Sequence, residues 1–330
     1  MKKRRLLQSG KMVSEVGLGC MSFGGSYGST DEAEAHATLG AALDLGVDFL
    51  DTSNIYGLGI SESVIGTFLK GDSSKFTIAT KAGIWRDKEH GNRGFNNKPD
   101  HLRSELEGSL KRLGLDHVDL FYVHRRDRGI EIEEVMQTLL GLKAEGKIGG
   151  IGFSEISPAS LRRATAVGPV DVVQREYSLW SRLPELGMLQ TCKELGVTLV
   201  AYSPLARGML SDVTPDPKRF LENDFRKNSP RFLEPNFSFN VPYTRAFKDY
   251  AHDIGTTATA LALAWCLARA EYIIPIPGTR SPDHLADCAA ASALTVTPDM
   301  LAEIDRILPV GWAHGDRYSH AQWAGPEGYC

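Results

Sequence analysis

The chain has 330 residues, a length at the upper end for one domain and typical of an α/β barrel with insertions. Hydrophobic residues make up 42% of it and charged residues 24%, enough for a large core beneath an ordinary polar surface. The net charge of −4 argues against a strongly basic nucleic-acid-binding face. We therefore expect one domain, residues 1–330, that does not bind nucleic acid.

Targeting signals and cysteine usage bear on the compartment. The first residues, MKKRRLLQSGKMVSEVG, have a basic run without the apolar run of a secretory signal. The longest apolar stretch, Ala258 to Ala268, is too short to span a bilayer. Five cysteines are scattered along the chain with no C-x-x-C pair. These features predict a cytoplasmic protein with reduced thiols and no membrane partner.

The predicted elements begin with two short strand-like segments around Ser9-Gly10, which indicate an N-terminal β-hairpin. A Gly-rich loop, MSFGGSYGS, follows, and then a helix from Asp31 to about Leu45. From there strands and helices alternate. The predicted strands are VDFLDT, KFTIATK, HVDLFYVH, IGGIGFS, DVVQREYS, VTLVAYSPL and EYIIPIPGT.

The alternation is interrupted once, between Ala206 and Pro242. This segment has five prolines and no helical or strand periodicity, so it is predicted to be a long loop or lid after strand 7. Two helices and a strand–helix pair then resume the pattern, and TPDMLAEIDRIL is predicted to be a final helix. About eight repeats of the strand–helix unit favour a closed (β/α)8 TIM barrel over an open sheet.

Several predicted strands carry polar groups at or near their carboxyl ends: Asp51, Lys81, His124 and Gln174, with Tyr56 just past the first. Because the carboxyl ends of parallel barrel strands lie on one rim, we expect these side chains to converge. Each alone has an ordinary structural interpretation, such as a turn aspartate, a packed tyrosine or a surface lysine or histidine. The joint pattern is what favours a functional site.

This set of side chains suits proton transfer to a carbonyl oxygen. Tyrosine is a poor acid near neutrality unless its phenolate is stabilised, and a neighbouring ammonium lowers its pKa by attraction. A carboxylate beside the lysine keeps that ammonium charged in a dry pocket. A histidine can orient the carbonyl group or share the proton.

The motifs GVDFLDTSNIYG, TKAG, RLGLDHVDLFYVH, GFSE, VVQREYSLW, AYSPLARG and IPGTR make the chain similar to the aldo-keto reductase family along nearly its whole length. The resemblance implies a barrel that binds NADP(H) without a Rossmann domain, with a hairpin over its bottom. It assigns the catalytic tetrad to Asp51, Tyr56, Lys81 and His124, with Tyr56 as general acid. The implied activity is NADPH-dependent reduction of an aldehyde or ketone to an alcohol.

The resemblance also implies cofactor contacts. Ser154, Glu155 and Gln174 would hold the nicotinamide carboxamide, although the family more often has Asn at the position of Glu155. Tyr202 would stack on the nicotinamide ring, and Arg280 would bind the 2′-phosphate. The residues expected along the rest of the cofactor are Ser203, Leu205, Gly208, Gly278, Thr279, His284, Asp287 and Cys288.

Aromatic residues that could wall the substrate pocket are Tyr27, Trp85, Tyr177 and Trp180, each of which could equally be a core residue. A Rossmann interpretation of GLGCMSFGG is disfavoured because Ser22 occupies the third glycine position. No metal is expected, since H-x-H and H-E-x-x-H motifs are absent.

Two alternative functions remain open at the level of sequence. Potassium-channel β subunits share this fold and tetrad but act as regulatory proteins; the lack of a long N-terminal extension favours the enzyme. An NAD(P)-dependent alcohol or sugar dehydrogenase would run the reaction in the oxidative direction. The sequence specifies neither the substrate nor the oligomeric state.

Overall fold

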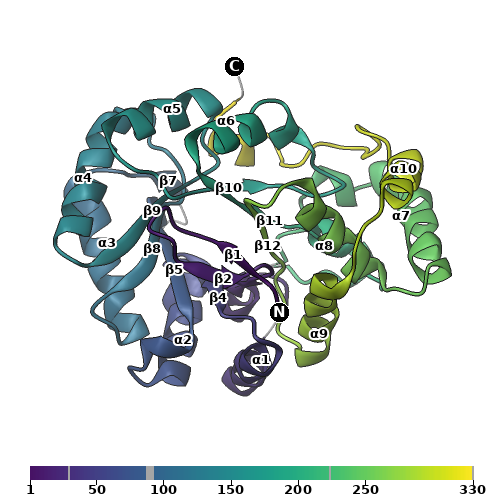
Figure 1. The fold of residues 1–330 in the computed structure, drawn as a ribbon, viewed down its shortest axis with the longest axis horizontal. Coiled ribbons are helices and arrows are strands. Elements are labelled where there is room, and N and C mark those ends of the chain that lie inside the picture. The colour runs from purple at the N-terminus through teal and green to yellow at the C-terminus, as the bar shows by residue number, and fades with distance from the viewer. Residues whose placement is uncertain (29, 87–92, 223, 329–330) are drawn as a thin grey trace.

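A single eight-stranded parallel sheet organises the protein. The computed structural model describes residues 1–28, 30–86, 93–222 and 224–328. The strands of this sheet are neighbours in their chain order (Figure 1). A bridge between Gly19, in the first strand, and Gly278, two residues past the last strand, brings the two edges of the sheet together as a barrel. The strands are β3 (Leu18–Gly19), β4 (Phe49–Asp51), β5 (Thr77–Ala82), β8 (Val118–Val123), β9 (Ile148–Ser154), β10 (Val172–Glu176), β11 (Thr198–Tyr202) and β12 (Ile273–Ile276).

Helices surround this sheet, and their ends carry the expected capping residues. For example, the first helix begins after Asp31, whose carboxylate accepts a hydrogen bond from the Glu34 amide, and ends at Gly46 in the left-handed conformation. The predicted TIM barrel is thereby confirmed. The helices are α1 (Glu32–Leu45), α2 (Ile60–Leu69), α3 (Pro99–Leu113), α4 (Ile132–Ala144), α5 (Pro158–Val167), α6 (Met188–Leu195), α7 (Asn236–Asp253), α8 (Ala258–Arg269), α9 (Pro282–Ala290) and α10 (Pro298–Ile307).

The predicted N-terminal hairpin is present. Its strands β1 (Lys3–Arg5) and β2 (Met12–Ser14) pair antiparallel, and Leu6, Leu7 and Val13 pack with the apolar side chains that fill the barrel interior. The hairpin thus covers the amino-terminal end of the barrel (Figure 1). The opposite end, where the strands finish, is left for a site.

The predicted loop after strand 7 is shorter than expected. Helix α7 begins at Asn236, so Pro242 lies inside a helix and not in the loop. The buried side chain of Asn240 donates hydrogen bonds to the carbonyl oxygens of Arg231 and His314 and holds this part of the helix against its neighbours. Such tertiary contacts override the low helix propensity of proline, which is why the sequence pattern placed the boundary too late.

The Gly- and Asn-rich segment after Lys81 contains a small antiparallel hairpin, β6 (Ile84–Arg86) and β7 (Arg93–Phe95). Residues 87–92 of this segment lie outside the described residues, as does Cys330. The remaining four cysteines are buried and free.

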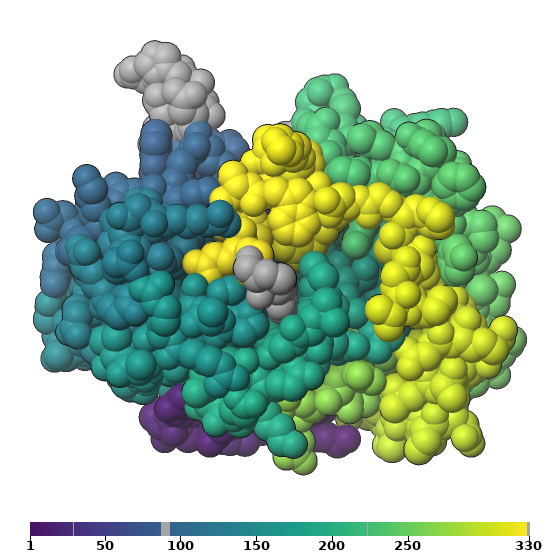
Figure 2. All heavy atoms as spheres, turned by 90° about the horizontal axis from the view of Figure 1, so that it is seen from above, coloured from purple at the N-terminus to yellow at the C-terminus, as the bar shows by residue number. Residues whose placement is uncertain are grey.

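The chain after α10 forms a tail, residues 309–328, which lies on the far side of the molecule from the purple N-terminal hairpin (Figure 2). Trp312 anchors its start by donating a hydrogen bond of 2.8 Å to the Leu179 carbonyl oxygen. Among the helices of the described chain, none combines the length and the apolar content that a membrane span requires.

Candidate active site

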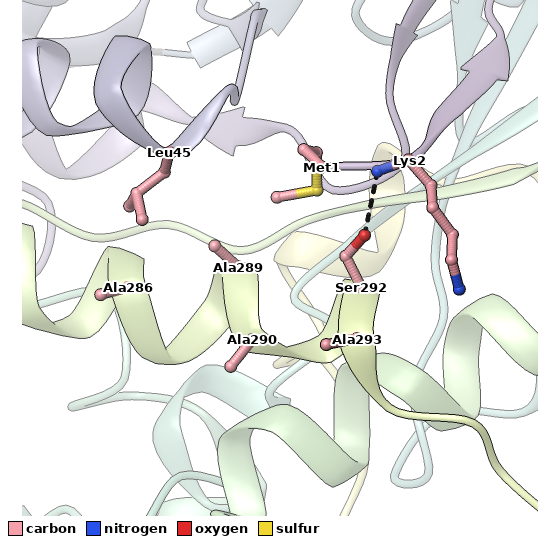
Figure 3. Close-up of a pocket in the computed structure, with 8 residues that line it drawn as sticks. All are labelled: Met1, Lys2, Leu45, Ala286, Ala289, Ala290, Ser292 and Ala293. Carbon is pink, nitrogen blue, oxygen red and sulfur yellow. Dashed lines mark hydrogen bonds between the residues drawn. The ribbon is translucent and has the colours of Figure 1, made fainter.

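A cleft of about 1210 Å³ opens at the carboxyl ends of the barrel strands. Asp51, Tyr56 and His124 line it, and so does Arg280. Another cavity, of about 540 Å³, lies at the N-terminus among Met1, Leu45 and several alanines of α9 and the turn that follows it (Figure 3). That cavity contains none of the predicted site residues, so the cleft is the candidate active site.

The side chains predicted to be catalytic gather at the cleft because alternate residues of each strand point into the barrel, and Lys81 lies just beneath the lining residues. Asp51 pairs with Ala79 in the sheet, and Lys81 lies two residues farther along the same strand, on the same face. The Lys81 ammonium forms an ion pair with Asp51 and donates a hydrogen bond of 2.8 Å to the Thr52 carbonyl oxygen. The same nitrogen lies 3.4 Å from the Tyr56 hydroxyl oxygen. The sequence-predicted Asp, Lys and Tyr therefore do meet.

Tyr56 is fixed by a close approach of the Gly-rich loop. A Cβ atom on Gly24 would lie 2.5 Å from the Gly57 nitrogen and 2.6 Å from the Tyr56 carbonyl carbon, so only glycine fits there. Gly57 itself adopts a φ of 61° in the turn that follows the tyrosine. Gly24 of GLGCMSFGG thus packs against the tyrosine turn, whereas Gly17 and Gly19 approach the end of β12 around Ile276.

His124 completes the group. Its ring lies edge-on to Tyr56 at 5.8 Å between centroids, and its Nδ1 atom lies 3.1 Å from the Ser53 hydroxyl. Burial, followed by repulsion from Arg125 and Lys81, holds the pKa of His124 well below its ordinary value. The imidazole is therefore neutral near pH 7.

The charges of Lys81 and Tyr56 are set by competing effects. Burial tends to lower the pKa of Lys81, but attraction by Asp51 and then Tyr56 outweighs it and raises that pKa. Burial also raises the pKa of Tyr56, and attraction by Lys81 opposes this without outweighing it. As expected, the Lys81 ammonium by itself lowers the pKa of Tyr56. The expected overall lowering is wrong for this structure, because burial raises that pKa by more.

Two of the three predicted carboxamide contacts lie at the cleft. The Gln174 amide donates to Asp51 Oδ2 at 2.8 Å, and the Ser154 hydroxyl accepts a hydrogen bond of 2.9 Å from Arg125 Nη1. Both residues line the cleft.

Glu155, the third predicted contact, is not among the lining residues. Its buried carboxylate accepts hydrogen bonds from Arg317 at 2.7 Å and from the Tyr202 hydroxyl at 2.9 Å, and it lies 3.6 Å from Arg175. The two guanidinium groups hold its pKa below the ordinary value, although burial alone would raise it. The prediction that this side chain faces the cofactor amide is corrected, because its oxygens are already engaged by protein cations.

The remaining predicted cofactor residues do surround one cleft. Arg280 donates a hydrogen bond of 3.0 Å from Nη1 to the Tyr27 carbonyl oxygen, which joins the loop after β12 to the Gly-rich loop. Only 2% of Cys288 is exposed, so it contributes little surface. The predicted residues that line the cleft with Arg280 are Tyr202, Ser203, Leu205, Gly208, Gly278, Thr279, His284, Asp287 and Cys288.

Most of the aromatic residues predicted to wall the substrate pocket lie elsewhere. Tyr27 lines the cleft, whereas Trp85, Tyr177 and Trp180 do not. Tyr177 is fully buried, with its hydroxyl donating to Glu185 at 2.8 Å. Trp180 is buried as well. The predictions for Tyr177 and Trp180 are wrong for the same reason, because the chain after β10 turns into the core. Trp85 instead lies exposed on β6.

The sequence interpretation missed several residues of the cleft. Arg207 pairs with Glu176 at 2.9 Å, and Arg226 lies over the Tyr27 ring at 5.2 Å. Arg207 could have been found in the AYSPLARG motif. Tyr318 and Gln322 belong to the C-terminal tail and have no local sequence signal. The missed lining residues include Arg86, Arg93, Arg125, Arg207, Arg226, Tyr318 and Gln322.

Within the described residues, no cluster of histidine, cysteine and acidic side chains could hold a metal ion. The fold and the site define a barrel protein whose tyrosine, lysine and histidine can exchange a proton with a bound oxygen. Residues 15–309 match the family model described as "Aldo/keto reductase family". The chain belongs to that family.

Individual relatives agree. "Aldo-keto reductase yakc [NADP(+)]" of Schizosaccharomyces pombe is 38% identical over 93% of this chain and 92% of that protein. Among solved structures, the glycerol dehydrogenase of Gluconobacter oxydans superposes with a TM-score of 0.84 at 27% identity, over 96% of this chain and 98% of that one. The holo form of an aldo-keto reductase of Bacillus halodurans gives a TM-score of 0.78, also at 27% identity, over 97% of this chain and 99% of that one.

Proposed function

We propose that this protein catalyses the reversible NADPH-dependent reduction of an aldehyde or ketone to an alcohol. One observation carries the proposal: the Tyr56 hydroxyl lies in the cleft, 3.4 Å from a Lys81 ammonium that Asp51 neutralises. A proton donor supported in this way fits a reaction in which a carbonyl oxygen becomes a hydroxyl.

The residues present fit a nicotinamide dinucleotide. The cleft volume of about 1210 Å³ exceeds the range of about 300–1,000 Å³ usual for one drug-sized ligand. Arg280 supplies positive charge for a phosphate group, and α9 directs its N-terminus toward the same cleft at Ser281. Arg207 and Arg226 also line the cleft, where each is paired with a carboxylate of the protein. We infer that Arg280 recognises the 2′-phosphate, in keeping with the NADP(+) in the name of the yeast relative.

Each catalytic side chain then has one role. Bound NADPH supplies the hydride that reaches the carbonyl carbon. Tyr56 donates its proton to the carbonyl oxygen, and Lys81 stabilises the phenolate that remains. Asp51 keeps Lys81 charged. Because Ser53 occupies Nδ1 of His124, the neutral ring has Nε2 left to orient the substrate oxygen.

The function is tested by mixing the purified protein with NADPH and a panel of aldehydes and ketones while following nicotinamide absorbance. We expect turnover with at least one carbonyl compound and weaker turnover with NADH. A protein of the channel-subunit type would bind NADPH without useful turnover, and a preference for NAD⁺ and alcohols would favour the dehydrogenase alternative. Buried free cysteines are compatible with a reducing cytoplasm, which we propose as the compartment.

A further inference from the structure

Arg125, which follows the catalytic His124 directly, is the most unusual cation in the cleft. It lines the cleft although only 8% of it is exposed. Its Nη1 atom donates hydrogen bonds to the His124 carbonyl oxygen at 2.7 Å and to the Ser154 hydroxyl at 2.9 Å. These two bonds fix the guanidinium between β8 and β9, beside the reacting end of the cleft.

The rest of this guanidinium is unused. Its Nε and Nη2 atoms make no hydrogen bond with the described residues, and no carboxylate of the described chain forms an ion pair with it. Other buried arginines differ: Arg207 pairs with Glu176 at 2.9 Å, and Arg317 pairs with Glu155 at 2.7 Å. Glu155 attracts this guanidinium only from beyond ion-pair distance. A buried charge that no carboxylate contacts directly is costly, so a position like this one suits an anion that arrives with a ligand.

The surroundings of Arg125 are also positive. Arg93 and Arg86, both exposed, line the same cleft from the β6–β7 hairpin. Partial enclosure by neighbouring groups and then repulsion by Arg125 lower the pKa of Arg93, although part of this side chain is exposed. Arg93 and Arg125 both contribute to lowering the pKa of His124. The charges of Arg93 and Arg125 therefore reach His124, which lines the same cleft.

We propose that the substrate is an oxo acid, an aldehyde or ketone that also carries a carboxylate, and that Arg125 binds this carboxylate with Arg93 assisting at the rim. The inference rests on the proposed carbonyl reduction and names its substrate class. The chemistry follows from the fork of the guanidinium: with Nη1 engaged, Nε and Nη2 form the edge that pairs two N–H groups with two carboxylate oxygens. The substrate carboxylate serves only to position the carbonyl group, and the reaction neither makes nor breaks a bond of the carboxylate.

The experiment compares two substrates that differ in this charge and in one added methyl group: 4-oxobutanoate and its methyl ester, each reduced with saturating NADPH. We expect kcat/KM for the acid to exceed that for the ester at least tenfold, mainly through a lower KM. Arg125→Gln should bring the ratio close to one, whereas Arg125→Lys should retain part of it. Arg93→Gln should reduce the ratio several-fold, and its effect should weaken as salt is added, since this arginine is exposed.

The ratio cancels any general loss of activity, because both substrates are measured on the same variant. Arg306→Gln, which removes an exposed arginine of α10 far from the cleft lining, is the charge-matched control and should leave the ratio unchanged. A wild-type ratio near one, or a ratio unaltered by both Arg125→Gln and Arg93→Gln, would overturn the proposal while leaving carbonyl reduction intact. If Arg125→Gln does not fold, the wild-type and Arg93→Gln ratios still decide. Failure to reduce either compound or any neutral aldehyde would instead reject the proposed function.

Discussion

Arg317 of the C-terminal tail donates a hydrogen bond of 2.7 Å to Glu155, the residue that follows β9, and both side chains are buried. The Tyr202 hydroxyl donates to the same carboxylate and also lies 2.7 Å from the Tyr318 hydroxyl. This small network fastens the tail to the strand end that carries the expected nicotinamide platform. The network depends on a buried ion pair, so removing either charge should destabilise the folded protein.

Glu155→Gln should therefore lower the free energy of unfolding by about 3–5 kcal/mol, because it leaves buried arginines without a countercharge. Urea unfolding at pH 7 measures this. Glu131→Gln, in an exposed pair with Arg163, is the matched control and should leave the stability nearly unchanged. Equal losses in the two variants would refute a stabilising role for the buried pair.

The same network predicts a pH dependence. The ion pairs hold the pKa of Glu155 below its usual value, so the folded protein binds this proton less readily than the unfolded chain does. Its stabilisation is complete above the unfolded pKa of about 4.3 and declines as the pH falls below it. The stability difference between wild type and Glu155→Gln should thus shrink below about pH 4.3 in urea titrations. A difference that grows on acidification would contradict this account.

The barrel itself was predictable because it rests on local patterns: alternating strands and helices, with polar residues at strand ends. Asp51 and Lys81 could be placed together since the carboxyl ends of neighbouring parallel strands must lie on one rim. Glu155 and Tyr177 could not be placed correctly. Their orientation depends on Arg317 and on the path of the chain after β10, which are tertiary features without a local signal.

Tyr56→Phe tests the proton donor. The variant should lose about 10²–10⁴-fold in turnover, the usual contribution of general acid catalysis, while NADPH binding changes little. Stopped-flow or steady-state absorbance measures turnover, and fluorescence titration measures cofactor affinity. Tyr250→Phe, outside the cleft, is the control. Retention of more than about a tenth of wild-type turnover would remove Tyr56 from this role.

Arg280→Ala tests cofactor choice. Charge-assisted hydrogen bonds contribute about 1.5–3 kcal/mol, so NADPH affinity should fall by about tenfold or more while NADH affinity stays nearly constant. Titration of both cofactors measures the split. Arg306→Ala controls for net charge. Equal losses for the two cofactors would mean that Arg280 acts on a part they share, or through its hydrogen bond to the Tyr27 carbonyl oxygen.

The loop after β11 provides the last prediction. Its far end is firmly packed, since Phe232 is 3% exposed within the core. Its middle is not: Val213 and Leu221 are 78% and 55% exposed. The middle also reaches the Gly-rich loop, where the Phe225 amide donates a hydrogen bond of 3.2 Å to the Ser26 carbonyl oxygen. We therefore expect the middle of the segment, not the whole of 206–242, to fold over the bound cofactor.

Limited proteolysis with trypsin separates this lid from a fixed decoration. Lys218 and Arg219 are exposed in the middle of the loop and should be cut readily without cofactor and much more slowly with saturating NADPH. Lys70, an exposed residue after α2 and outside the cleft, is the internal control and should be cut at one rate in both conditions. Protection confined to the loop supports a lid whose opening limits cofactor exchange. Equal rates at Lys218 with and without NADPH would mean that the loop is a fixed part of the barrel rim, packed through its phenylalanines.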